Sequence, residues 1–177
     1  MMNALLFFWH SIKMWTRTAP LSGSELPYDG ESWNKMGNVQ KLNCYDYAWG
    51  NANPHQLEFS QPIPRPPNEL YTCNNVEKGM MKQHPDAEII EFEQSCPSGK
   101  RKVALVVDDV APSDYHWYRQ DNDGFWSHKQ GYMNPTNLDA SGDVIKDPRK
   151  SDRKFEHFNY TKMCNFYCIP GATPQNS

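Results

Sequence analysis

The sequence predicts an α+β protein in which a few short helices precede a small antiparallel β-sheet. Three observations predict this class. Fourteen prolines in 177 residues exclude an all-helical chain and indicate long loops. Helical patterns occur in the first half of the chain, and strand patterns follow as close neighbours in the second half. A length of 177 residues without an internal repeat suits one domain.

The first candidate helix is short and has clear signals at both ends. Asn43 is a good N-cap, residues 44–49 can form the helix, and Gly50 can end it. The Pro-rich stretch 54–67 follows, and its composition predicts an extended surface connection rather than a ligand segment for a partner.

The second candidate helix covers residues 69–84. Asn68 can cap its start, apolar side chains recur at roughly helical spacing, and Pro85 stops it.

The strand candidates share short runs of apolar, β-branched or aromatic residues bounded by turn residues. They are 89–92, 103–107, 114–120, 125–129 and, more weakly, 144–145 and 166–169. The run 103–107 is apolar enough for a central strand. The charged triplet 100–102 before it is expected to guard a sheet edge rather than bind a ligand.

The turn between strands 114–120 and 125–129 decides where two histidines point. A three-residue loop, 122–124, with Gly124 in the left-handed conformation pairs Tyr118 with His128. His116 then lies diagonal to His128 on the same face, because side chains alternate along a strand. The other odd loop, 121–123, pairs the histidines directly, and an even loop would separate them.

Cys44 lies in the first turn of the first candidate helix, directly after the cap residue. The unpaired N–H groups and dipole of a helix N-terminus can lower a thiol pKa and can form half of an oxyanion hole. The alternative interpretation is a buried structural cysteine.

Three segments together resemble a known enzyme group. Asn-Cys-Tyr-Asp-Tyr-Ala (43–48), Asp-Tyr-His-Trp-Tyr-Arg (114–119) and Phe-Trp-Ser-His-Lys (125–129) are similar to the nucleophile, base and orienting segments of NlpC/P60 and CHAP cysteine peptidases and amidases. The resemblance covers about 44–130. The long Pro-rich stretch, the bulky residues around His116 and the segment 137–148 depart from that pattern.

This resemblance implies a papain-like α+β domain, with N-terminal helices followed by a small antiparallel sheet or half-barrel. The domain is expected over 26–177, after an N-terminal arm at 1–25. The resemblance also implies hydrolysis of a peptide or amide bond, with a cell-wall, peptidoglycan-like peptide as one candidate substrate. Cys44 would attack the carbonyl, His116 would take the thiol proton, and His128 would orient His116.

Other members of the site are less well determined. The Cys44 N–H would form part of the oxyanion hole, and Asn38 or Gln40 is the candidate for the second donor. Asp114 and Asn137 compete with His128 for the orienting role.

A second hypothesis is a non-catalytic module on the same fold that binds a glycan or peptide through aromatic side chains. Trp117, Trp126 and Tyr118 are the candidate binding residues, although core packing is the alternative for the tryptophans.

The five cysteines have an odd count, so at least one stays unpaired within the chain. Besides Cys44 they are Cys73, Cys96, Cys164 and Cys168. We expect the last two to be core thiols, with disulfides to Cys73 or Cys96 and a zinc site as alternatives. This favours a cytoplasmic or virion- or phage-associated protein over a secreted one.

The net charge of −3 gives no basis for a nucleic-acid partner. The best apolar run, residues 4–9, is far shorter than the roughly 20 residues of a membrane span and makes a poor signal peptide. No Gly-rich phosphate loop or paired-carboxylate motif supports a kinase or a glycosidase. We therefore expect no metal and no cofactor, and composition leaves the oligomeric state open.

Overall fold

The computed structural model describes residues 18–34, 38–52, 59–64 and 70–171 of the chain. The helical elements are α2 (Gly30–Asn34), the 3-10 turn η1 (Asn38–Gln40), α3 (Cys44–Trp49) and α4 (Cys73–Gln83). The strands are β1 (Glu88–Ile90), β2 (Lys100–Asp108), β3 (Asp114–Gln120), β4 (Trp126–Lys129), β5 (Pro135–Thr136) and β6 (Lys162–Pro170). Short helices before a sheet confirm the predicted α+β class.

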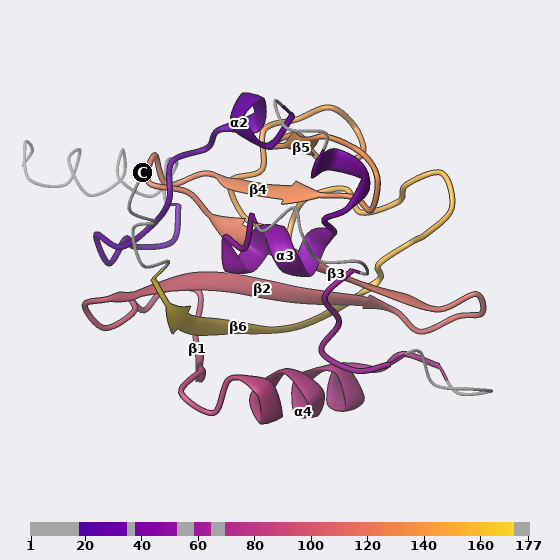
Figure 1. Ribbon diagram of the computed structural model, residues 1–177, viewed down its shortest axis with the longest axis horizontal. Helices are drawn as coiled ribbons and strands as arrows, with labels where there is room; N and C mark the ends of the chain where they lie inside the picture. The colour runs from indigo at the N-terminus through magenta and orange to yellow at the C-terminus, as the bar shows by residue number, and fades with distance from the viewer. Residues whose placement is uncertain (1–17, 35–37, 53–58, 65–69, 172–177) are drawn as a thin grey trace, which may run out of the picture.

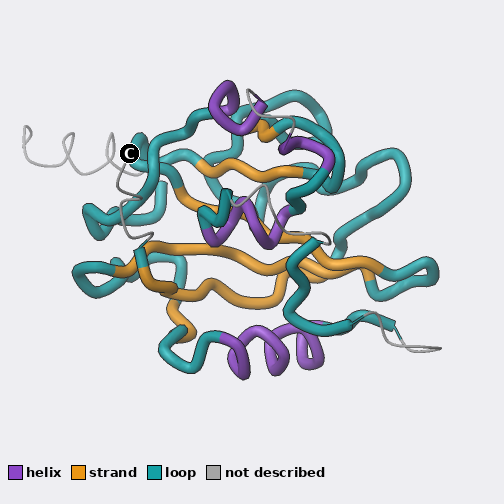
Figure 2. The backbone as a smooth tube through the Cα atoms, viewed as in Figure 1, coloured by secondary structure: helices purple, strands orange, loops and turns teal. Residues whose placement is uncertain are grey.

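The strands form one antiparallel sheet in the order β1-β6-β2-β3-β4-β5. Helix α3 lies across one face of this sheet, and α4 lies toward its β1 and β6 side (Figure 1). Much of the chain between β5 and β6 is loop (Figure 2). Among the described residues, no helix has the length and apolar character to cross a membrane.

Helix α3 forms where the sequence predicts it, because both of its ends are satisfied locally. The side chain of Asn43 accepts hydrogen bonds from the backbone N–H groups of Tyr45 and Asp46. The Asp46 carboxylate in turn accepts the N–H of Asn43, which completes a capping box. Gly50 ends the helix in the left-handed conformation at φ 67°.

Helix α4 begins later than predicted. Thr72 and Asn75 form a reciprocal capping box that starts the helix at Cys73. The expected cap, Asn68, lies outside the described residues, as do parts of the Pro-rich stretch 54–67.

The sheet corrects several strand predictions. Strand β2 lies between β6 and β3, so the expectation that residues 100–102 guard an edge is wrong. Arg101 and Lys102 are buried and donate to the backbone carbonyls of Ala48 and Phe92, respectively. Val144 forms only an isolated bridge with Leu138, and the sequence did not predict β5.

Apolar side chains pack on both faces of the sheet. One core cluster joins Cys44 and Tyr45 of α3 and residues of α4 to Leu105 and Trp117. The other lies on the opposite face and includes Tyr118, Trp126 and residues of the loop before β6. Cys44 belongs to the first cluster, whereas His116 contacts Tyr118 and Tyr160 of the second.

Part of the expected N-terminal arm packs on the sheet. Ala19 is buried, and its carbonyl accepts a hydrogen bond of 2.6 Å from the Gln120 side chain. Residues 22–24 contact the turn before β2 through Ser24, whose hydroxyl accepts the N–H of Gly99. The rest of the arm, residues 1–17, lies outside the described residues.

Two disulfide bonds correct the expectation of core thiols. Cys73 of α4 is bonded to Cys164 of β6, and Cys96 is bonded to Cys168 of the same strand. These were the alternative pairings, and they exclude a zinc site built on those sulfurs. Cys44 is the free cysteine.

Candidate active site

A cavity of about 630 Å³ lies at the start of β3 and the end of β4. It is lined by Cys44 at the N-terminus of α3, by His116 of β3 and by aromatic side chains from several loops. Its volume falls within the range of roughly 300–1,000 Å³ that is usual for ligand sites. The structure therefore brings two of the three predicted catalytic residues to the wall of one cavity.

The predicted hairpin geometry is confirmed. Gly124 has φ 88°, and Tyr118 pairs with His128 across the two strands. His116 and His128 therefore share a face, and His116 Nε2 lies 2.8 Å from His128 Nδ1.

The hydrogen bonds of this pair determine which ring nitrogens carry protons. His128 Nε2 lies 3.0 Å from the backbone carbonyl of Leu138. Because a carbonyl can only accept, Nε2 of His128 carries its proton and Nδ1 accepts from His116 Nε2. The unprotonated nitrogen of neutral His116 is consequently Nδ1. This is the nitrogen that could accept a proton from a reactant.

Burial keeps both imidazoles neutral. It lowers the pKa of His116 well below its ordinary value, and a protonated His128 beside it would lower the value further. Burial also lowers the pKa of His128 to about 4, against smaller opposing effects of the Leu138 carbonyl and Asp139. Tyr160 stacks on the His116 ring with centroids 5.2 Å apart, and Tyr118 packs against the ring in a T-shaped arrangement at the same centroid distance.

The thiol of Cys44 differs from the sequence expectation. Burial raises its pKa to about 12, and the charges of Asp114 and Asp46 add to the increase. Hydrogen bonding from the backbone of Trp117 and Tyr45 works in the opposite direction but is outweighed. The expected lowering of the pKa by the helix is therefore wrong.

Burial is the main reason why the thiol stays neutral, and the capping box limits the stabilisation of a thiolate that the helix N-terminus provides. The side chain of Asn43 already accepts the N–H groups of Tyr45 and Asp46. The Asp46 carboxylate adds a negative charge to the same turn. The thiol is therefore neutral in the resting protein.

The thiol and the histidine pair pack on different faces of β3. Cys44 belongs to the core cluster that contains Trp117, whereas His116 lies on the face of Tyr118 and Tyr160. Among the residues that the structure describes, no hydrogen bond joins the Cys44 thiol to either imidazole. Action of Cys44, His116 and His128 as a catalytic triad thus stays a prediction.

Of the two predicted second oxyanion donors, Gln40 is not among the described residues that line the cavity. Gln40 is exposed in η1, and the side chain of Asn38 lies outside the described parts of the chain. Gln61 and Gln130 also line the cavity, and neither could be predicted from the sequence. No local pattern marks them, because each comes from a loop that reaches the site only in the folded chain.

The alternative orienting residues have other partners. Asp114 lines the cavity, and its carboxylate accepts a hydrogen bond of 2.8 Å from the Tyr160 hydroxyl. Asn137 uses its carbonyl to accept the N–H of Ile145 and lies on a different surface hollow. The group that holds His128 is the Leu138 carbonyl, a backbone atom that no side-chain motif could reveal.

The prediction that three aromatic side chains form a binding surface is wrong. Trp117, Trp126 and Tyr118 are fully buried, with 0% exposure, and they divide between the two core clusters. Their size and apolar character make them core residues, so none is available to stack on a ligand at the surface.

Lys129 anchors the loops that carry the site. Its buried ammonium donates to the carbonyl oxygens of Val39, Leu42 and Gly131, the first at 2.7 Å. Two of these carbonyls belong to the segment that leads into α3, and the third belongs to the cavity wall. The Lys129 side chain thereby connects the segment that precedes Cys44 to the turn after β4.

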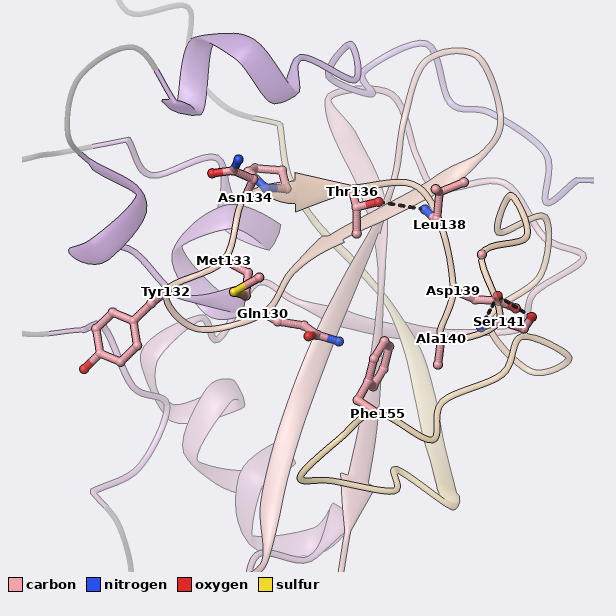
Figure 3. A pocket seen from close by; sticks show the side chains of 12 residues that line it. Gln130, Tyr132, Met133, Asn134, Thr136, Leu138, Asp139, Ala140, Ser141 and Phe155 are labelled. Carbon is pink, nitrogen blue, oxygen red and sulfur yellow. Dashed lines mark hydrogen bonds between the residues drawn. The ribbon is translucent and has the colours of Figure 1, made fainter.

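A second cavity, of about 650 Å³, adjoins the first (Figure 3). The two share Gln130, Tyr132, Met133 and Phe155 as lining residues. Figure 3 shows Tyr132 directed outward from the turn, and its exposed fraction is 66%. Asp139 lies on the opposite wall, where its carboxylate accepts the N–H and the hydroxyl of Ser141.

Comparison with known proteins gives a relative but no structural neighbour. No protein-family model matches the chain, and no solved structure matches it. The chain is 35% identical over 126 residues to insoluble matrix shell protein 1 of Ruditapes philippinarum. The match covers 71% of this chain and 80% of that protein.

Proposed function

The chain belongs to the family of insoluble matrix shell protein 1 of Ruditapes philippinarum, and from this premise we propose that it works outside the cell in an insoluble matrix. The observation that carries the proposal is the pair of disulfides, which bind β6 to α4 and to the loop after β1. Disulfides persist in oxidising surroundings and are rare in the cytosol.

The location can be tested on native material with an antibody against the chain. We expect the protein in the extracellular, detergent-insoluble fraction. Alkylation under denaturing conditions before reduction, followed by mass spectrometry, should label Cys44 alone and leave the other four cysteines paired. Recovery from the cytosol with all cysteines labelled would contradict the proposal.

We also propose a second function, in which the papain-like site expected from the sequence hydrolyses a peptide or amide bond. The observation in its favour is the pair of hydrogen bonds from His116 to His128 and from His128 to the Leu138 carbonyl. These bonds leave Nδ1 of His116 unprotonated, so it can act as the base. Cys44 and His116 line the same cavity, where a bound acyl group could contact both.

Because the resting thiol is neutral, the proposed mechanism is general-base catalysis rather than attack by a preformed thiolate. The sulfur attacks the acyl carbon as its proton passes to His116 Nδ1, and the carbonyl π pair moves to oxygen. The backbone N–H of Cys44, which has no acceptor within the helix, can donate to that oxyanion. The oxyanion then collapses and the C–N bond breaks as the leaving amine takes the proton from His116. Water attacks the thioester as its proton passes to His116, and the C–S bond breaks to release the acid while the sulfur takes that proton back.

Labelling with a peptide electrophile that fills the cavity tests this mechanism. We expect covalent modification of Cys44, and we expect His116→Ala to slow it by about 100-fold or more, which is the usual contribution of a general base. Small iodoacetamide should label the thiol slowly at neutral pH because its pKa is raised to about 12.

His157 provides a matched control for this labelling, because it lines the same cavity with a side chain that is 76% exposed. His157→Ala should slow the labelling far less than His116→Ala does, because His157 takes up no proton in the proposed step. Equal rates in wild type and His116→Ala would contradict the hydrolase proposal.

A further inference from the structure

Seven of the described residues that line the cavity around Cys44 are phenylalanine or tyrosine. Three ring pairs contribute to it from separate segments of the chain. Phe59 contacts Tyr132 with centroids 5.1 Å apart, and Tyr71 contacts Tyr115 at 5.0 Å. Phe158 stacks on Tyr160 at 5.9 Å. Such a wall provides apolar area and ring faces that also attract cations.

The charges on this wall have one sign. Asp114 lies half-buried beside Tyr160, and Glu156 lies at the rim with a side chain that is 88% exposed. Among the described lining residues, none is lysine or arginine. A carboxylate that entered the cavity would lose water and meet two carboxylates, whereas an ammonium or guanidinium group would meet rings and opposite charge.

We propose that this cavity binds a peptide segment in which a lysine or arginine is flanked by uncharged or aromatic residues, and that it rejects acidic peptides. The inference rests on the hydrolase proposal only where cleavage is concerned, because binding requires no reaction. The cavity size suits a short segment of chain rather than a folded partner.

Peptide binding to the intact chain carrying Cys44→Ala tests the inference without turnover. The probes are fluorescent peptides Gly-Tyr-X-Phe-Gly with blocked ends, where X is lysine, glutamine or glutamate. At low ionic strength we expect the lysine peptide to bind about tenfold more tightly than the glutamate peptide, with glutamine between them. Equal or tighter binding of the glutamate peptide overturns the inference, and so does a failure of all three peptides to bind.

The rim carboxylate provides a variant that should still fold. Glu156→Gln should reduce the preference for lysine over glutamine by about two- to threefold, as for an exposed ion pair. Glu91→Gln is the matched control, because Glu91 is also exposed but lies outside the cavity. An equal loss in both variants would show that net charge, and not the cavity, selects the peptide, and would overturn the inference.

The wild-type chain separates this inference from the hydrolase proposal. If the lysine peptide binds to Cys44→Ala but is not cleaved by wild type, the binding inference stands and the hydrolase proposal fails. If only acidic peptides are cleaved, the hydrolase proposal stands and the binding inference fails.

Discussion

Removal of either disulfide is expected to lower the free energy of unfolding by about 4–5 kcal/mol. The reason is the length of chain that each bond closes. Cys73 and Cys164 are 91 residues apart in sequence, and Cys96 and Cys168 are 72 residues apart. Each bond strongly lowers the conformational entropy of the unfolded chain. The two bonds contribute nearly equally to stability, because the entropy of loop closure depends only on the logarithm of the loop length.

Urea unfolding of two double variants measures this effect. One variant combines Cys73→Ala with Cys164→Ala, and the other combines Cys96→Ala with Cys168→Ala. Since a domain usually has only about 5–15 kcal/mol of stability, we expect the chain without both bonds to be largely unfolded. Cys44→Ala is the control, because it removes the free cysteine and leaves both bonds intact. Unchanged unfolding midpoints after reduction of the wild type would contradict this prediction.

Features that depend on neighbouring residues could be predicted from the sequence. Helix α3 forms where expected because Asn43, Asp46 and Gly50 satisfy its ends within one short segment. The register of the β3–β4 hairpin depends on a turn with Gly124 at positive φ, so the alignment of the two histidines could be predicted from the same turn.

Features that depend on distant parts of the chain could not be predicted. The disulfides join residues brought together only by the sheet, where β6 lies beside β1 and β2. Lys102 looks like a surface residue in the sequence, but the loop after β1 places the Phe92 carbonyl against it. The charges of residues 100–102 therefore led to a wrong prediction of a sheet edge, although the apolar run 103–107 correctly predicted a central strand.

The thiol shows the same limit within the site. The position of Cys44 after a helix cap predicts a lowered pKa, and the structure raises that pKa to about 12. Two long-range effects decide the sign, namely burial in the core and the charge of Asp114 from another strand. The third partner of the histidine chain is a backbone carbonyl, which has no sequence signature.

Acid is expected to destabilise the fold between pH 6.5 and 4 because of the buried histidine pair. The pKa of His128 is lowered from 6.5 in the unfolded chain to about 4 in the folded one. The unfolded state therefore binds a proton first as the pH falls, and stability that is complete above pH 6.5 is progressively lost. For His128 alone the loss is about 2 kcal/mol at pH 5 and about 3 kcal/mol below pH 4.

His116 acts in the same direction, since burial lowers its pKa well below 6.5 and its Nε2 lies only 2.8 Å from Nδ1 of His128. The lowered pKa of the half-buried His84 also adds to the loss, whereas the raised pKa of the Asp121 carboxyl opposes it. We therefore expect the net effect to be a loss of stability over this window.

Urea unfolding at pH 7, 6 and 5, with NMR titration of the histidine ring protons, distinguishes the contribution of His116 and His128 to the acid effect from that of the other titratable groups. In the folded protein the ring signals of His116 and His128 should not shift above pH 5, because burial lowers the pKa of both rings. His128→Gln should reduce the loss of stability between pH 7 and 5, because glutamine can still hydrogen bond to the Leu138 carbonyl but takes up no proton. His157→Gln is the matched control and should keep the full loss. If both variants lost stability equally with acid, the buried pair could not be the group whose titration causes the loss.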